Sequence, residues 1–528
     1  MSGVEHLFEK LSNYTERDIY PYHMPGHKRR SFGMLPEELY KIDITEIDGF
    51  DNLHQPEDIL RSLQQEAAAL YGAEESFYLV NGSTGGILSA VSSALPVGGH
   101  ILMARNCHKS AYHAAYLRGL SVTYLYPPFL EEYDIYDAIE PWQIRQALEW
   151  EPDIGAVLIV SPTYEGRISD IRAIAEIVHE KGIPLIVDEA HGAHLGLGGG
   201  LPPNSCQLGA DLVIHSIHKT LPALTQTALL HVNGGRIDRE RLRRFLRIYQ
   251  SSSPSYLLMA GIDNALEHVK EDRSVFVRFR ERYESLVRNL TDCCRYLRFL
   301  PMEDGKQDVG KLLVSVKQSG LTGRQLYDIL LQKYHLQPEM AAVSFVLAMF
   351  TVNDSEEGYR RMARALLEID ASLGGERAEN IFCEFRAQGH GKRCSGQDAE
   401  NFEEGRKRQD VESFERRLCV EVSDSNPERR EKGEHREKRQ DDGIIPLAEA
   451  WDRKTEMTSL EESVGRLIGE FINLYPPGVP LLVPGERMTE RLCGEIRNAL
   501  EQGLQVQGVQ RKKRRGEAAE VISVPVIL

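Results

Sequence analysis

Short apolar segments alternate with amphipathic ones between about residues 70 and 235, and this alternation most restricts the possible folds. The stretch 171–182 has apolar residues at helical spacing and ends in a glycine. The apolar segments are rich in β-branched residues and predict strands at 75–80, 100–105, 154–162, 183–191 and 211–219. Apolar strands separated by helices are typical of a mainly parallel sheet with both faces covered. We therefore predict an α/β fold for this region.

Composition changes along the chain predict five parts. After the alternating region, 239–300 has helical periodicity, and strands are predicted at 311–316 and 341–352. Residues 374–443 are highly charged and poor in apolar residues, so we predict a solvated, disordered insertion there. The predicted parts are an N-terminal segment at 1–50, a large domain at 51–300, the first part of a small α+β domain at 301–373, the insertion at 374–443 and a C-terminal domain at 444–528.

Polar residues follow several of the predicted strands at their carboxyl ends. Ligands bind at this edge of such sheets, so these residues are the first candidates for a site. Asp188 ends the apolar run IPLIVD, and His191 follows three residues later. Lys219 lies at the end of the last predicted strand, in SIHKT. His108 follows the second strand.

Lys219 and Asp188 together indicate a particular chemistry. A lysine that is partly desolvated has a lowered pKa, which favours a free amine able to form a Schiff base. A buried carboxylate needs a partner, and in pyridoxal-phosphate enzymes that partner is the pyridinium nitrogen. Taken alone, most lysines that follow strands are solvated. The carboxylate at a neighbouring strand end makes the functional interpretation stronger.

Small and hydroxyl residues provide a possible phosphate site. Asn81-Gly82-Ser83-Thr84-Gly85-Gly86 opens a predicted helix, where exposed N–H groups and the helix dipole favour an anion. Ser216 and His218 flank Lys219 and could add contacts, and His108 could stack on an aromatic ring. Each signal also has an ordinary explanation, such as a glycine-rich turn or a core histidine. Their order on successive strand ends favours a pyridoxal-phosphate site.

Nine segments spread over most of the chain outside 374–443 carry a family resemblance. They are PYHMPGHK (21–28), ITEIDGFDNLHQPEDIL (44–60), FYLVNGSTGGI (77–87), ARNCHKSAYHA (104–114), SPTYEGRISDI (161–171), VDEAHGAH (187–194), SIHKTLPALTQTALLH (216–231), QSSSPSYLLMAGID (250–263) and YPPGVPLLVPGE (475–486). With these segments the chain resembles the Orn/Lys/Arg decarboxylases, pyridoxal-phosphate enzymes of fold type I, the aspartate aminotransferase-like class. It is similar to the short form, without an N-terminal wing domain. The charged insertion departs from the family pattern.

The resemblance implies a role for each matching residue. Lys219 would hold the cofactor covalently, Asp188 would pair with its ring nitrogen, and His108 would stack on the ring. His191 would lie near the ring and the substrate. The phosphate would contact Ser83, Thr84, Ser216 and His218, and Ser252 would reach the phosphate of a neighbouring subunit. His23, His27 and Glu486 would approach the substrate entrance.

The implied reaction is decarboxylation of a basic L-amino acid in polyamine metabolism. Arginine is the first candidate because short-form members resemble biosynthetic arginine decarboxylases, followed by lysine and then ornithine. The distal cationic group would need an acidic partner, and a guanidinium favours a bidentate carboxylate. Asp48, Asp51 and Glu486 are candidates from their motif positions, and structural hydrogen bonds would explain them equally well.

The overall charge and the cysteines restrict partners and location. Lys and Arg number 63 against 79 Asp and Glu, a net charge of −16, which argues against a nucleic-acid partner. No apolar run reaches the roughly 20 residues of a membrane helix, and the N-terminus lacks the apolar core of a signal peptide. Eight scattered cysteines without a CxxC pair fit free thiols in a reducing cytoplasm. Fold-type I sites are generally built at a two-fold interface, so we expect at least a homodimer.

Alternative functions share parts of these motifs. Asp188 to His191 spell the DEAH box of helicases, but no GxxxxGK[ST] phosphate loop precedes them. A metal site at Asp188, His191 and His194 is disfavoured, because these residues follow a strand and do not have zincin spacing. An aminotransferase or another pyridoxal-phosphate lyase would share Lys219 and Asp188. A catalytically silent regulator is the alternative from another class, and the intact Lys219 and Asp188 argue against it.

Overall fold

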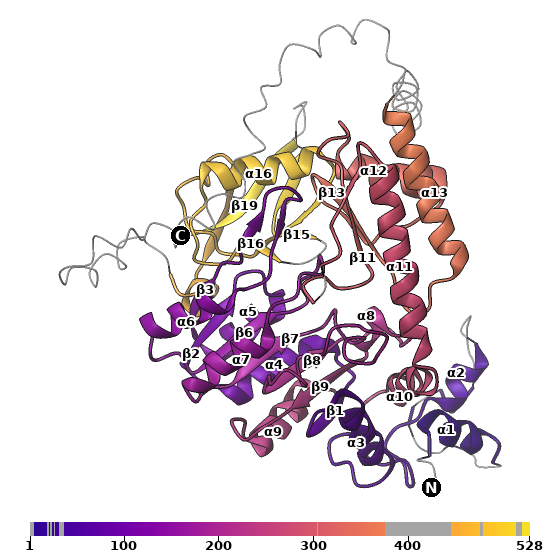
Figure 1. The fold of residues 1–528 in the computed structure, drawn as a ribbon. Helices are drawn as coiled ribbons and strands as arrows, with labels where there is room; N and C mark the ends of the chain where they lie inside the picture. Colours follow the sequence, from indigo (N-terminus) through magenta and orange to yellow (C-terminus); the bar gives the residue numbers. More distant parts are fainter. Residues whose placement is uncertain are drawn as a thin grey trace, which may run out of the picture.

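The computed structural model describes residues 5–17, 21, 24–25, 27–30, 36–303, 305–374, 445–475, 479–513 and 520–528 (Figure 1). The predicted insertion at 374–443 lies outside the described residues, apart from Gly374. His23, one of the predicted substrate residues, also lies outside them.

A seven-stranded sheet forms the centre of the large domain. Its strands are β1 (Glu75–Leu79), β2 (His100–Ala104), β3 (Ser121–Leu125), β6 (Ala156–Val160), β7 (Leu185–Asp188), β8 (Leu212–His215) and β9 (Ala228–Val232). They are ordered β1-β9-β8-β7-β6-β2-β3. All five predicted strands are present, so the expected α/β class is confirmed. Strands β3 and β9 were not among the predicted strands.

Strand direction brings the predicted site residues to one edge. The pairs β3–β2, β2–β6, β6–β7 and β7–β8 are parallel, whereas β9 is antiparallel to both β8 and β1. Every strand of this sheet except β9 therefore runs in the same direction. The carboxyl ends of β1, β2, β6, β7 and β8 consequently share one edge, where such folds bind their ligands.

Helices cover the sheet closely. They are α3 (Ile59–Tyr71), α4 (Gly82–Ala94), α5 (Lys109–Arg118), α6 (Pro141–Trp150), α7 (Ile171–Glu180) and α9 (Arg239–Tyr249). All residues of β7, β8 and β9 are buried, and because neighbouring side chains point to opposite faces, both faces are covered. A Cβ added at Gly86 would lie 2.7 Å from Leu79 Cδ1 and 3.1 Å from Ile214 Cγ2. This glycine therefore allows α4 to approach β1 and β8.

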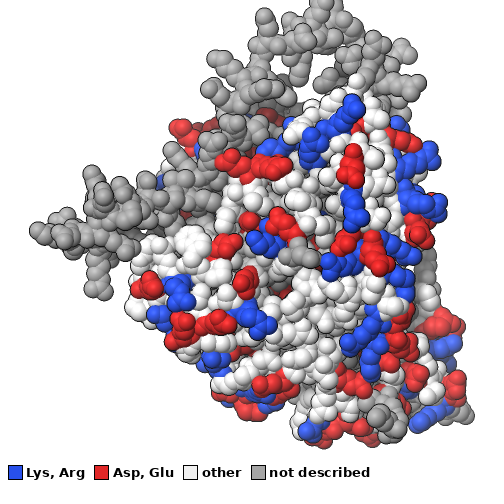
Figure 2. Space-filling view, in the orientation of Figure 1, with Lys and Arg blue, Asp and Glu red and all other residues white. Residues whose placement is uncertain are grey.

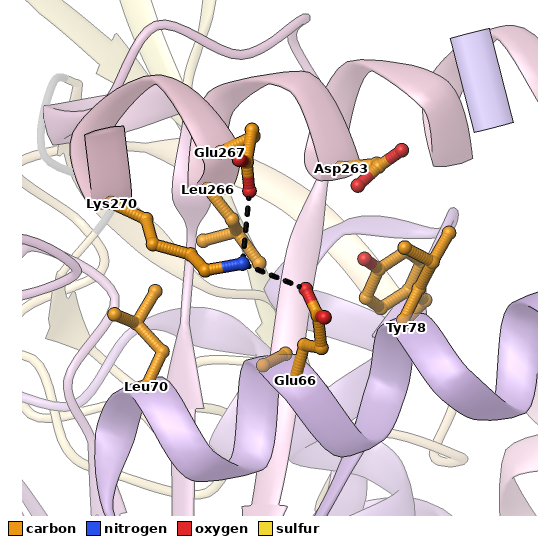
Figure 3. A pocket seen from close by; sticks show the side chains of 9 residues that line it. Glu66, Leu70, Tyr78, Asp263, Leu266, Glu267 and Lys270 are labelled. Carbon is orange, nitrogen blue, oxygen red and sulfur yellow. Dashed lines mark hydrogen bonds and ion pairs between the residues drawn. The ribbon is translucent and has the colours of Figure 1, made fainter. Parts of the chain in front are cut away.

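The N-terminal helices pack beside this domain. Helix α1 (Leu7–Thr15) contacts α10 (Tyr256–Glu271) and α2 (Glu37–Ile42). Figure 3 shows a small hollow between α3 and α10, where Lys270 Nζ lies 3.1 Å from the Oε2 atoms of both Glu66 and Glu267. None of the residues predicted for the active site lines this hollow. We assign these ion pairs to the packing of the two helices.

The smaller α+β domain is built on a four-stranded antiparallel sheet of order β10-β11-β13-β12. The predicted strand at 341–352 is in fact two strands. The chain turns between them at Val343 and Ser344, with the Ala342 N–H donating to Phe345 O over 2.9 Å. A single serine in a largely apolar segment did not reveal this turn. The elements are α11 (Ser274–Cys293), β10 (Arg298–Phe299), β11 (Lys311–Ser315), α12 (Gly323–Tyr334), β12 (Met340–Ala341), β13 (Phe345–Met349) and α13 (Glu356–Leu373).

The C-terminal residues form two three-stranded sheets, β14-β19-β18 and β16-β15-β17, with helix α16. Their connection to the large domain includes the buried Arg105, whose guanidinium lies 3.0 Å from Glu486 Oε2 and donates to Pro480 O over 2.8 Å. The elements are α15 (Leu447–Ala450), β14 (Thr455–Ser459), β15 (Ile472–Tyr475), β16 (Pro480–Leu482), α16 (Glu490–Glu501), β17 (Gln505–Gln507), β18 (Gln510–Lys513) and β19 (Glu520–Ile527).

Acidic and basic side chains are mixed over the face of the molecule that Figure 2 shows. Among the described helices, none combines the length and the apolar character that crossing a membrane needs.

Candidate active site

Lys219 lies in the short helix α8 (Ile217–Thr220), immediately after β8. Its Nζ is 3.1 Å from Nε2 of His191, which belongs to the loop after β7. Burial lowers the pKa of Lys219, and the carboxylates of Asp188 and Glu339 oppose that shift. The surroundings therefore favour the uncharged amine more than water does.

Asp188 is the last residue of β7, and its side chain is buried. Burial raises its pKa, whereas the nearby Lys219 and the Ala190 N–H, which donates to Oδ1 over 3.2 Å, oppose the rise. Within the described residues, no side-chain hydrogen bond or ion pair to this carboxylate is present. A buried carboxylate without a directly bonded cation suits a protonated ring nitrogen.

The predicted phosphate residues come from two segments that are held together. Ser83 and Thr84 lie in the first turn of α4, after Gly82 at φ +68°. Gln226, from the loop after α8, donates to Val80 O just before this turn over 2.6 Å. His218 is already engaged, because its Nδ1 lies 2.9 Å from Thr227 O.

Ser216 tests whether a phosphorylated cofactor fits these residues. Its side chain is fully buried, and Oγ has no hydrogen-bond partner among the described residues. An unsatisfied buried hydroxyl is unfavourable, so it indicates a polar group that completes the site. Together with the buried carboxylate and the amine of Lys219, this hydroxyl fits pyridoxal phosphate.

His108 lies at the start of α5, close enough to Lys219 to be affected by its charge. It is the N-cap of α5, and its Nδ1 lies 2.9 Å from Ser110 Oγ. Burial lowers the pKa of His108 to about 4, and the positive charge of Lys219 adds to this effect. The imidazole is therefore uncharged at neutral pH and presents a flat face without the hydration of an ion, which suits stacking on a cofactor ring.

The structure places three residues near Lys219 that the sequence analysis did not single out. The ring of Tyr164 lies edge-on to His191 at a centroid distance of 4.8 Å, and its hydroxyl donates to Glu339 Oε1 over 2.5 Å. Lys311, the first residue of β11, places Nζ 2.7 Å from His191 Nδ1. A possible signal was the charge of Lys311 at the start of an apolar strand. For Glu339 we find no local signal.

Asp51, another predicted substrate residue, forms hydrogen bonds with backbone groups near the start of α3. The carboxylate of Asp51 accepts hydrogen bonds from the backbone N–H groups of Asn52, Glu57, Asp58 and Leu60 over 2.8 to 3.0 Å. Burial alone would raise the pKa of Asp51, but these four bonds lower it overall. The structure thus gives Asp51 a structural task at the start of α3, the alternative that the sequence left open.

Glu486, His27 and Ser252 have no hydrogen bond or ion pair to Lys219 within the described residues. Glu486 pairs with Arg105 and accepts from the Val483 N–H over 2.9 Å. His27 Nε2 lies 3.2 Å from Asp43 Oδ2. Ser252 is exposed in the loop between α9 and α10, and Asp48 lies in the loop before α3. Their substrate and interface roles stay predictions.

The DEAH letters have a structural explanation. Glu189 is buried, and its carboxylate accepts from Ser205 Oγ over 2.7 Å and lies 2.6 Å from His215 Nε2. His194 pairs with Asp308 over 2.7 Å. Within the part of the chain that is described, no group of three or more His, Cys, Asp and Glu side chains is arranged to hold a metal ion.

Comparison with known proteins identifies the family. Residues 5–296 match the family model "Orn/Lys/Arg decarboxylase, major domain", and residues 446–523 match the model of the C-terminal domain of the same family. Two relatives are the arginine decarboxylases of Bacillus anthracis and Bacillus subtilis, which are 28% and 29% identical. Each alignment covers 95% of this chain, and 94% and 95% of the respective relative.

A solved structure shows a similar fold. The constitutive lysine decarboxylase of Escherichia coli superimposes with a TM-score of 0.75 at 19% sequence identity. The superposition covers 99% of this chain and 82% of the lysine decarboxylase.

Proposed function

Because this chain belongs to the Orn/Lys/Arg decarboxylase family, it is a pyridoxal-phosphate-dependent decarboxylase, and we propose that its substrate is L-arginine. The observation that carries the choice of arginine is the alignment of two arginine decarboxylases with 95% of the chain. When bound, pyridoxal phosphate supplies a sink for the electrons of the bond between Cα and the carboxylate. The products would be CO₂ and agmatine, a precursor for polyamine synthesis.

The residues around Lys219 would each bind a different part of the cofactor. Lys219 would bind it covalently through its amine, which burial keeps reactive. Asp188 would keep a proton on the ring nitrogen, and the uncharged His108 would stack on the ring. Ser83, Thr84, Ser216 and His218 would bind the phosphate.

Lys219 and His191 would also transfer the proton that takes the place of the carboxylate on Cα. The 3.1 Å contact between Lys219 Nζ and His191 Nε2 allows a proton to pass between the two groups. Burial lowers the pKa of His191 well below its usual value, and Lys219 and Lys311 lower it further. His191 therefore stays neutral at rest and can transfer a proton without storing a charge.

Substitution of Ser216 by alanine should weaken cofactor binding without destabilising the cofactor-free protein. The hydroxyl has no partner among the described residues, so its removal loses no internal hydrogen bond. It would remove a phosphate contact, worth about 1.5–3 kcal/mol for a bond to a charged group, or roughly 10- to 150-fold in affinity. Cofactor titration followed by visible absorbance, with thermal unfolding of the cofactor-free protein, tests both parts. An unchanged cofactor affinity would show that Ser216 does not contact the phosphate.

The choice of substrate is tested by offering L-arginine, L-lysine and L-ornithine separately to the cofactor-loaded protein. We expect CO₂ and agmatine from arginine. The kcat/KM for lysine and for ornithine should be at least about 10-fold lower, which corresponds to a difference of roughly 1.4 kcal/mol in transition-state binding. Cadaverine or putrescine as the main product would confirm decarboxylation, but would show that lysine or ornithine, and not arginine, is the substrate. Bound cofactor without CO₂ from any of the three would instead favour an aminotransferase or another lyase, and a protein that binds no cofactor would favour a silent regulator.

The proposal includes a homodimer in the cytoplasm. Fold-type I sites are generally completed across a two-fold interface, and the exposed Ser252 would face the phosphate of the second subunit there. The cysteines support the location: Cys107, Cys206, Cys293, Cys294 and Cys493 are free thiols in the described part of the chain, as expected in a reducing compartment.

A further inference from the structure

Glu339 is an exposed glutamate of the smaller domain that lies close to the candidate active site. It directly precedes β12, an edge strand of the four-stranded sheet. Its backbone N–H donates to Leu347 O on β13 over 2.9 Å, which fixes the residue to this edge. Within the described residues, no Lys, Arg or His side chain forms an ion pair with its carboxylate. The charge of Glu339 is therefore available to a ligand.

Three successive contacts lead from Lys219 to Glu339. Lys219 Nζ lies 3.1 Å from His191 Nε2, and the ring of Tyr164 lies edge-on to this histidine at a centroid distance of 4.8 Å. The Tyr164 hydroxyl then donates to Glu339 Oε1 over 2.5 Å. Lys219 belongs to the large domain and Glu339 to the smaller one, so the two residues border one region between the domains. Small-molecule sites form preferentially at such places.

Tyr164 orients the carboxylate of Glu339 without using it up. The tyrosine ring packs against a buried cluster of the smaller domain that includes Leu313 and Leu347, which holds its hydroxyl in place. An ionised carboxylate has about four lone-pair sites, so one hydrogen bond from Tyr164 leaves both oxygens able to accept. Lys311 Nζ lies 5.6 Å from the centre of the Tyr164 ring but contacts His191 instead of pairing with Glu339.

We propose that Glu339 binds the guanidinium of arginine and makes the site selective for it. The α-amine of the substrate would be held at Lys219, so the distal cation has to extend from there toward a group of opposite charge. A planar guanidinium gives two parallel N–H groups to the two oxygens of one carboxylate, whereas the ammonium of lysine or ornithine is a point charge. The inference rests on the proposed decarboxylation of arginine and names the residue that recognises the distal cation.

Two carboxylates that the sequence suggested for this task are engaged in other bonds. Asp51 accepts four backbone N–H groups at the start of α3. Glu486 forms an ion pair with the buried Arg105. Neither has a printed contact with Lys219 or with the residues that touch it, whereas Glu339 is joined to Lys219 through Tyr164 and His191. Of these three carboxylates, Glu339 alone combines that position with the lack of a basic partner among the described residues.

The test compares Glu339→Gln with wild type in the full-length, cofactor-loaded protein. Glutamine keeps the shape but loses the charge and one acceptor oxygen, so the KM for L-arginine should rise about 10-fold or more. The kcat should stay within about threefold, because the lost contact binds ground state and transition state alike. Calorimetric titration with agmatine, which carries the guanidinium but has no carboxylate to lose, should show the same loss of affinity. The inhibition constant of L-norleucine, which has no distal polar group, should not change.

Two further variants complete the experiment. Tyr164→Phe keeps the charge of Glu339 but removes the bond that orients it, so the KM for arginine should rise only about threefold. Glu357→Gln is the matched control, because Glu357 is exposed on α13 of the same domain and pairs with Arg360 of its own helix. Its constants should equal those of wild type.

The outcomes separate the role of Glu339 from the proposed function. An unchanged KM for arginine in Glu339→Gln would overturn the proposal. An equal loss of arginine and norleucine binding would overturn it as well, because it would indicate general damage to the pocket. A wild-type protein that releases no CO₂ from arginine would contradict the proposed function itself, whereas wild-type turnover with an unaffected Glu339→Gln contradicts only the role of Glu339.

Discussion

Lys219→Ala should abolish decarboxylation, with a loss of at least about 10³-fold in kcat. The amine is the group that would bind the cofactor covalently and return a proton to Cα, and alanine can do neither. Burial lowers the pKa of this lysine, so wild type holds a reactive amine that the variant lacks. Release of CO₂ from the arginine-loaded protein measures the loss, and the visible absorbance of the bound cofactor should disappear with it.

Lys270→Ala is the matched control for this experiment. Lys270 pairs with Glu66 and Glu267 on α3 and α10 (Figure 3), and its side chain is 46% exposed. Its loss should change stability by less than about 1 kcal/mol and leave turnover intact. A Lys219→Ala protein that keeps more than a small fraction of wild-type turnover would show that another residue holds the cofactor.

Asp188→Asn should lower kcat by about 10²-fold or more while the cofactor stays bound. Asparagine is close in shape but carries no charge, so it cannot keep a proton on the ring nitrogen. Burial already raises the pKa of Asp188, so an uncharged replacement should not destabilise the folded protein. Turnover of arginine, cofactor absorbance and thermal unfolding together separate a lost charge from a lost fold.

Asp170→Asn provides the comparison for Asp188→Asn. Asp170 is exposed and caps α7, where its side chain accepts from the Ala173 N–H over 3.1 Å, and asparagine caps helices equally well. Turnover should therefore remain at the wild-type level in this variant. Unimpaired turnover in Asp188→Asn, by contrast, would exclude the role of Asp188 in ring protonation.

Local sequence was sufficient for five of the seven strands of the central sheet, but not for β3 and β9. The segments IPLIVD and DLVIH contain almost only apolar residues, and they form β7 and β8. The largely apolar segment 341–352 shows the limit of predictions from local sequence. Periodicity reports that a segment is buried but not where it turns, so two antiparallel strands were predicted as one.

The residues around His191 show a second limit. Lys311 is 120 positions from His191 in sequence, yet the two side chains are in contact. Such a contact depends on how the small domain packs against the sheet edge, and no local pattern encodes that packing. The same holds for Glu486, which the sequence associated with the substrate entrance and the structure pairs with Arg105.

The α/β class, the family and the order of polar residues at the strand ends could be predicted, because each depends on residue types at short spacing. The place of β9 between β1 and β8, and the contacts of two lysines with the nitrogens of one histidine, follow from packing and were not predictable. The physical reason is that side-chain chemistry and burial are local properties of a segment. The neighbours of a buried charge are selected by the packing of distant segments, which the whole chain has to satisfy at once.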